Sequence, residues 1–204
     1  MTLTTWLAVV SICALGAMSP GPSLAVVLRH TFAGGRTQGA IVALTHGLGV
    51  GLYALACISG LALLLTTSPR LFLAFQWAGA AYLAWLGLRA LLSRASSPEA
   101  VQTATDGRGA AQDGFMIVFL NPKIAVFFIA LFSQVIGTET SLPAKLGYAA
   151  TAMVIDAGWY LLVAWLVSVP AWLPRLQAKA HWIERAFGVI LLALAARLVW
   201  LTLV

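Results

Sequence analysis

The sequence predicts an all-α polytopic membrane protein with six transmembrane helices, arranged as two inverted three-helix repeats with interrupted first and fourth helices. Three observations lead to this fold class. The 204 residues are 61% hydrophobic and 9% charged, whereas about a quarter of an ordinary soluble domain is charged. Apolar runs of about 20 residues, long enough to cross a bilayer, recur along the chain. Two of these runs contain prolines where an uninterrupted helix would exclude them.

The apolar runs are separated by short polar stretches. "AGGRTQG" and "TTSPR" are typical of turns and loops, and the core of a soluble protein would account for one such run rather than a series. The first run has no basic residue before Arg29, so we interpret it as a span and not as a signal peptide. The predicted spans are residues 4–32, 39–65, 71–92, 114–136, 143–169 and 182–204.

One connection is longer and of different composition. Residues 93–113, "SRASSPEAVQTATDGRGAAQD", are polar, mixed in charge and rich in Ser, Thr, Ala and Gly, which is typical of a flexible linker. This linker divides the chain into a first three-helix repeat, residues 1–92, and a second, residues 114–204. Because each repeat has an odd number of spans, we expect the two repeats to lie in the membrane with opposite orientations.

The basic residues predict the topology, since cytoplasmic loops carry an excess of Lys and Arg. The first, third and fifth connections are therefore assigned to the cytoplasm and both termini to the outside. The net charge of +6 is explained by this asymmetry, and nucleic acid is not an expected partner because no basic stripe with interleaved aromatic residues is present. The cytoplasmic side has eight basic residues against three: Arg29, Arg36, Arg89, Arg94, Arg108, Arg175, Lys179 and Arg185 against Arg70, Lys145 and Arg197.

The first interruption is the sequence "MSPGPS". Pro20 and Pro22 each deprive the carbonyl four residues earlier of its helical partner, and Gly21 between them permits unusual backbone angles. In hydrocarbon, such groups are tolerated only where they face protein or a water-filled cavity. The helix that restarts near Ser23 has unpaired N–H groups and a positive dipole end, which favour an anion. The alternative is a simple packing kink.

A second interruption lies in the fourth span, in "FLNPKIAVFF". Asn121 suits a helix cap and Pro122 the first helical position. Interrupted spans at corresponding positions of two inverted halves indicate a transporter binding site. The two breaks are not expected to be equivalent, because about sixteen apolar residues precede Pro20 and about seven precede Pro122. The predicted substrate-binding residues are Pro20, Gly21, Pro22, Ser23, Asn121, Pro122, Lys123 and Asp156.

Ionisable groups inside the spans are the next candidates, because a charge at mid-membrane costs about 2.5–3.5 kcal/mol on insertion scales. One interpretation is that Asp156 neutralises Lys123 in a structural ion pair. The other is that Asp156 contacts the ammonium group of the substrate, while Lys123 or the Ser23 amides contact the carboxylate of the substrate. Asp156 and His46 are the candidates for proton coupling; a hydrogen-bonded structural role is the alternative for His46. Ala43, Gly47 and Gly51 have the small-xxx-small spacing of close helix packing.

At these residues the chain resembles the LysE/RhtB family of amino-acid exporters. The resemblance covers essentially the whole sequence and rests on "MSPGPS", "WAGAAYLAWLGLRALL", "GFMIVFLNPKIAVFF", "IDAGWYLLVAW" and "RAFGVILLALAARL". It implies a multi-pass protein of the bacterial cytoplasmic membrane that exports amino acids or close derivatives, energised by the proton motive force. Ser23 stands where the family commonly has Asn or Asp, and Gln76 where it commonly has Lys. Both departures leave the family function intact and bear on which amino acid is the substrate.

Two other function classes remain as alternatives. A membrane thiol-disulfide carrier needs a reactive cysteine in each half, but Cys13 and Cys57 both lie in the first half and are interpreted as small buried hydrophobes. An intramembrane enzyme is less expected, because the sequence has no H-E-x-x-H and no other constellation of metal ligands or nucleophile. No catalytic residue, metal or cofactor is therefore predicted. The oligomeric state is left open, a homo-oligomer included.

The topology can be tested with reporter fusions. Reporters placed after Ser96 and Gln177 should report the cytoplasm, and a reporter at the C-terminus should report the outside, because the Lys and Arg excess marks the cytoplasmic connections. A cytoplasmic C-terminus would remove one span or invert the assignment.

Overall fold

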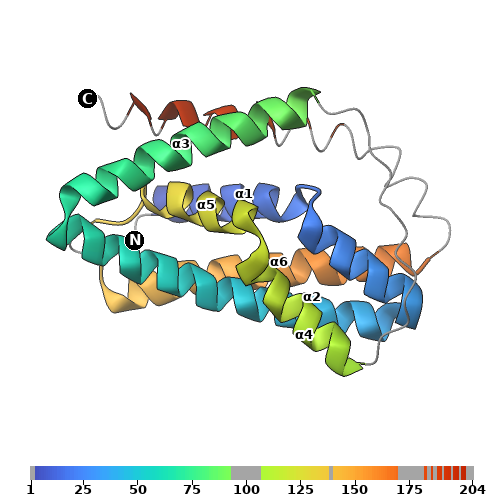
Figure 1. The fold of residues 1–204 in the computed structure, drawn as a ribbon. Coiled ribbons are helices and arrows are strands. Elements are labelled where there is room, and N and C mark those ends of the chain that lie inside the picture. The colour runs from blue at the N-terminus through green and yellow to red at the C-terminus, as the bar shows by residue number, and fades with distance from the viewer. Residues whose placement is uncertain are drawn as a thin grey trace.

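The fold was analysed in a computed structural model. It describes residues 3–92, 107–137 and 140–169, together with scattered positions between Trp182 and Trp200. These parts of the chain are helical and contain no strand, in agreement with the predicted all-α class (Figure 1). The described positions from Trp182 to Trp200 are helical as well. The continuous helices are α1 (Leu3–Met18), α2 (Pro22–Thr67), α3 (Pro69–Leu92), α4 (Gly107–Leu120), α5 (Pro122–Phe132) and α6 (Leu142–Val167).

Both predicted interruptions are present. α1 ends at Met18 before the first one, and α5 begins at Pro122 directly after the second. α1, before the first break, has 16 residues and α4, before the second, has 14, so the two helices are similar in length although α4 begins with polar residues. The fourth span begins at Gly107 and not at residue 114, so the end of the predicted linker is helical. A helix that extends past its apolar residues places Asp113 where it binds Arg29 of α2.

α2 consists of two helical parts that meet at a sharp turn. Gly34 and Gly35 are not helical, and Gly35 has φ 71° and ψ −166°, a conformation that a side chain would strain. The predicted loop "AGGRTQG" is therefore reduced to these two glycines. Figure 1 shows the chain reversing here, so that residues 22–33 complete the first span and residues 36–67 form the second.

The second part of α2 is the central element of the fold, and it packs most extensively against α6 and α4. A Cβ added to Gly47 would lie 2.6 Å from the Ala157 Cβ of α6, and one added to Gly51 would lie 3.0 Å from the Met153 Cβ. The close packing predicted from the small-xxx-small spacing is confirmed. On another face, Gly49 approaches Val118 of α4 in the same way.

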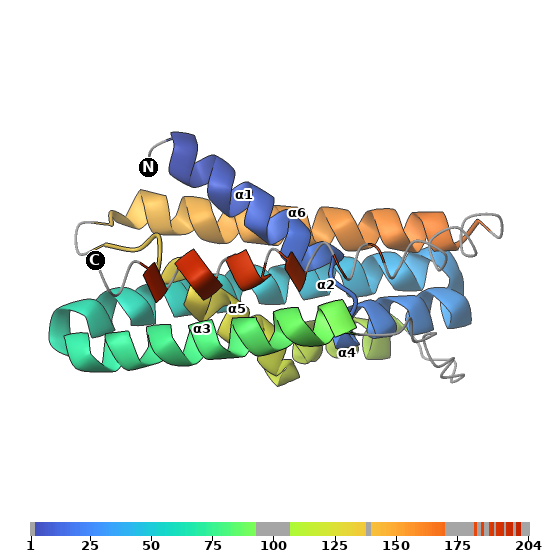
Figure 2. The ribbon, with the colours of Figure 1, turned by 90° about the horizontal axis from the view of Figure 1, so that it is seen from above.

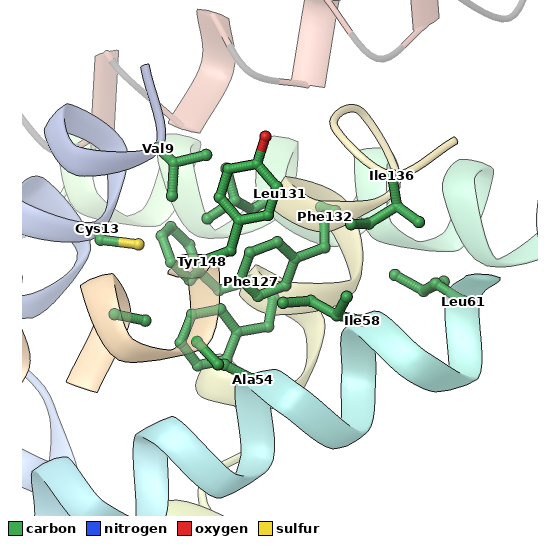
Figure 3. Close-up of a cluster of buried hydrophobic side chains, with 14 of the residues drawn as sticks. Val9, Cys13, Ala54, Ile58, Leu61, Phe127, Leu131, Phe132, Ile136 and Tyr148 are labelled. Carbon is green, nitrogen blue, oxygen red and sulfur yellow. The ribbon is translucent and has the colours of Figure 1, made fainter. Parts of the chain in front are cut away.

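The remaining helices enclose an apolar cluster around α5. Figure 3 shows this cluster, in which Val9 and Cys13 of α1 and Tyr148 of α6 surround Phe127 and its neighbours. α3 packs on the outside of α5, beside the described C-terminal residues (Figures 1 and 2). In this way, the helices after residue 107 bury their apolar faces against those before residue 92.

Length and composition identify candidate membrane spans among the described residues. Pro22–Leu63 and Leu142–Val167 are each long and apolar enough to cross a membrane. The bent pair Arg108–Leu120 and Lys123–Phe132, inclined at 58°, is a third candidate if it counts as one broken span. The arrangement as two inverted repeats of three spans stays a prediction.

The packing of α2 on α6 can be tested with two glycine variants of the same helix. Gly47→Ala should destabilise the protein by about 1–3 kcal/mol, because the added methyl group meets the backbone of Ala157 and overpacks the contact. Gly60→Ala is the matched control, because nothing lies within 4 Å of its added Cβ. Thermal unfolding of the detergent-purified variants measures both. Equal melting temperatures for Gly47→Ala and the wild type would contradict the close contact.

Candidate functional site

The two interruptions meet at one cavity of about 60 Å³, several times the roughly 10–15 Å³ that a single water needs. Its walls come from α1, α2, α5, α6 and the two breaks. They combine polar residues of the breaks, a titratable pair and an apolar wall. The lining residues are Cys13, Gly16, Ala17, Ser19, Gly21, Ser23, His46, Val50, Asn121, Lys123, Ile124, Phe127, Phe128, Ala152, Asp156 and Tyr160.

Asn121 connects the two breaks. Its Oδ1 accepts a hydrogen bond from the backbone N–H of Lys123 at 3.1 Å, which caps α5. Its Nδ2 donates to the Ser23 Oγ at 3.2 Å, so the same side chain reaches the first turn of α2. Both side chains are buried. Asn121 therefore satisfies one helix end and fixes the position of the other.

Lys123 connects the breaks a second time, again from the second break to the first. Its Nζ donates to the Ser19 Oγ and, at 3.2 Å, to the Pro20 carbonyl. The Gly16 carbonyl, which Pro20 deprives of its usual helical partner, accepts instead from the Ser19 N–H at 3.3 Å. Polar groups exposed by the proline break are thus satisfied inside the protein, and a positive charge is held beside the cavity.

Asp156 and His46 form a buried pair on the other side of the cavity. The His46 Nδ1 lies 2.6 Å from the Asp156 Oδ2. A carboxylate only accepts hydrogen bonds, so Nδ1 is the donor. The second ring nitrogen, Nε2, is buried and has no hydrogen-bond partner among the described residues. In the structure Asp156 contacts His46, because α2 and α6 approach closely enough for His46 to reach it, and the Lys123 Nζ donates to Ser19 and Pro20.

Tyr160 belongs to the site and is missing from the predicted residues. Its side chain is hydrogen-bonded to that of Ser23, and its ring contacts the His46 ring edge-on, with centroids 5.0 Å apart and planes at 78°. It joins the break residues to the titratable pair. Its position in the sequence could have predicted this role, because Asp156 is four residues earlier and residues four apart on a helix share a face.

The structure brings most of the predicted site residues together. Pro20 and Pro22 are not among the described residues that line the cavity, but they shape the first break beside it. The sequence analysis missed Ser19 and the apolar wall, and it treated Cys13 only as a buried hydrophobe. The predicted residues that line the cavity are Gly21, Ser23, His46, Asn121, Lys123 and Asp156.

A second charged cluster lies outside the cavity. Asp113 of α4 forms an ion pair with Arg29, and its Oδ2 lies 3.0 Å from the Nε2 of the buried His30 of α2. The sequence analysis interpreted Arg29 only as a topology signal. In the structure it also fastens the first part of α2 to α4.

The match to a family model covers residues 14–202 of the chain, and the matching family is described as LysE type translocator. The chain belongs to this family. The resemblance deduced from the motifs around the two breaks is thereby confirmed. Both breaks, the titratable pair and all the lining residues of the cavity except Cys13 lie within the matched residues.

Curated relatives match the chain over nearly its whole length. A threonine efflux protein of Salmonella typhimurium is 29% identical, covering 93% of this chain and 94% of the relative. A homoserine/homoserine lactone efflux protein of the same organism is 30% identical, covering 97% of both. A chemotactic transduction protein of Pseudomonas aeruginosa is 34% identical, covering 87% of this chain and 89% of the relative. No solved structure matches the chain significantly.

Proposed function

We propose that the protein exports an amino acid across the cytoplasmic membrane in exchange for protons. The observation that carries this proposal is the cavity between the two helix breaks, which has a lysine on one side and a buried carboxylate–imidazole pair on the other. The names of two relatives, a threonine and a homoserine efflux protein, support an amino acid as the substrate.

A zwitterionic amino acid matches these charges. Lys123 and the N-terminal ends of α2 and α5 favour the carboxylate, because helix N-termini present unpaired N–H groups and a positive dipole end. Asp156 and the unpartnered Nε2 of His46 face the ammonium. Each end of the substrate then meets its opposite charge in a site where water screens little, and such interactions are stronger than in bulk water.

The His46–Asp156 pair also provides a means of proton coupling. With a neutral imidazole the pair carries one negative charge, and Nε2 can accept a hydrogen bond from the ammonium. With an imidazolium the pair is neutral, and Nε2 becomes a donor that repels the ammonium. Proton and substrate therefore compete for the same pair. A substrate bound from the cytoplasm is released outside when a proton from the more acidic side replaces it.

The two breaks support alternating access. Each interrupts one helix near the cavity, and in the predicted inverted topology they approach it from related elements of the two repeats. Asn121 and Lys123 hold the breaks together, so a movement of one half is transmitted to the other at the substrate. The first part of α2, hinged at Gly35, is the element we expect to move.

The function is tested in proteoliposomes with an acidic interior. Wild-type protein should accumulate a labelled amino acid against its gradient only while the proton gradient lasts. His46→Gln should retain exchange of internal for external substrate but lose accumulation, because exchange needs no proton. Asp156→Asn should lose both, because it removes the charge that faces the ammonium.

The matched control for His46→Gln is His30→Gln, which changes the other buried histidine of α2 outside the cavity. It should retain both exchange and accumulation. Gradient-driven accumulation by His46→Gln at the wild-type rate would remove the coupling role of His46. Absence of transport for every amino acid tried with folded wild-type protein would contradict the function itself.

A separate variant tests the first break. Replacing both Pro20 and Pro22 with Ala should allow α1 to continue into α2, with insertion and folding retained and transport lost, because Ser19 and Ser23 would no longer meet Lys123 and Asn121. Pro143→Ala is the control. This proline lies in the first turn of α6, where the backbone N–H that proline lacks would have no helical partner. Undiminished export by the double variant would reduce the motif to a packing kink.

A further inference from the structure

One wall of the cavity is entirely apolar. It is formed by five side chains that also belong to the apolar cluster around α5, and Figure 3 shows two of them, Cys13 and Phe127, within that cluster. The Cys13 thiol is its strongest polar group, and a thiol is only a weak donor and acceptor. The wall consists of Cys13, Val50, Phe127, Phe128 and Ala152.

The polar groups elsewhere in the cavity are already engaged with one another or face the substrate's charged ends. Ser23 accepts from Asn121 and is hydrogen-bonded to Tyr160, and Ser19 accepts from Lys123. The His46 Nε2 lies at the end proposed for the ammonium. A hydroxyl on the substrate's side chain, directed at the apolar wall, would find no partner there.

We infer that the substrate of this protein is an amino acid with an aliphatic side chain, such as valine, and that the apolar wall that includes Cys13 sets this preference. This inference rests on the proposed function, because the placement of the two charged groups decides where the side chain points. With the carboxylate at Lys123 and the ammonium at Asp156, the side chain faces the wall.

The size of the preference follows from the chemistry of the wall. An apolar pocket rejects an isostere that adds a hydroxyl by a factor of about 100 at most, because the hydroxyl loses its hydrogen bonds to water without replacement. A pocket that provides a partner rejects the analogue lacking the hydroxyl far more strongly. Valine and threonine have nearly the same shape. The ratio of their KM values therefore reports whether the side chain of the substrate lies against the apolar wall.

The first experiment compares these two amino acids in wild-type proteoliposomes with an acidic interior. We expect the KM for L-threonine to exceed that for L-valine by about tenfold to a hundredfold. An equal or lower KM for threonine overturns the inference and leaves the proposed amino-acid export intact. If neither these nor other amino acids are transported, the proposed function fails, and this inference fails with it.

The second experiment uses two variants of Cys13. Cys13→Ser adds a hydroxyl to the wall with little change in shape, so the threonine-to-valine ratio of KM values should fall several-fold. Cys13→Ala removes the thiol without adding a hydroxyl and should leave the ratio near that of the wild type. If Cys13→Ser does not fold, Val50→Thr adds a hydroxyl to the same wall. An unchanged ratio in the folded hydroxyl variant overturns the role of the wall.

Discussion

The structure depends on the rule that backbone polar groups cannot be left unsatisfied in hydrocarbon. Two helices are interrupted inside the apolar part of the chain, and the second break supplies hydrogen-bond donors to the first. Lys123 donates to the Pro20 carbonyl beside the first break, and Asn121 reaches from the second break to Ser23. These hydrogen bonds hold the two breaks together, and the cavity lies where they meet.

The titratable pair depends on a second constraint, the close approach of α2 and α6. Gly47 follows His46, and Ala157 follows Asp156. The contact between Gly47 and Ala157 leaves no room for a further methyl group, so the absence of a side chain at Gly47 allows His46 to lie 2.6 Å from Asp156. Gly47, which has no side chain, thus positions the two groups that we propose to bind the proton.

The sequence predicts those parts of the site that are encoded locally. Proline in an apolar run marks a break wherever it occurs, and a carboxylate or lysine in such a run needs a partner. The partner of Asp156 was not predictable, because it depends on the rotation of α6 about its axis and on the packing of α2. Tyr160 was missed for the same reason. The start of α4 at Gly107 was missed because a helix end outside the membrane carries polar residues, like a linker.

Charged and polar groups inside a membrane raise the free energy of the folded protein. Lys123, His46 and Asp156 are three such groups, and all of them line the cavity. Asn121 and the serines offset part of this cost through hydrogen bonds, but the His46 Nε2 has no partner in the described structure. Under the proposed function, the ammonium of a substrate donates to this nitrogen, whereas a proton on the imidazole makes the pair neutral and turns Nε2 into a donor. The two occupants therefore exclude each other, and this competition is what the proposed coupled exchange requires.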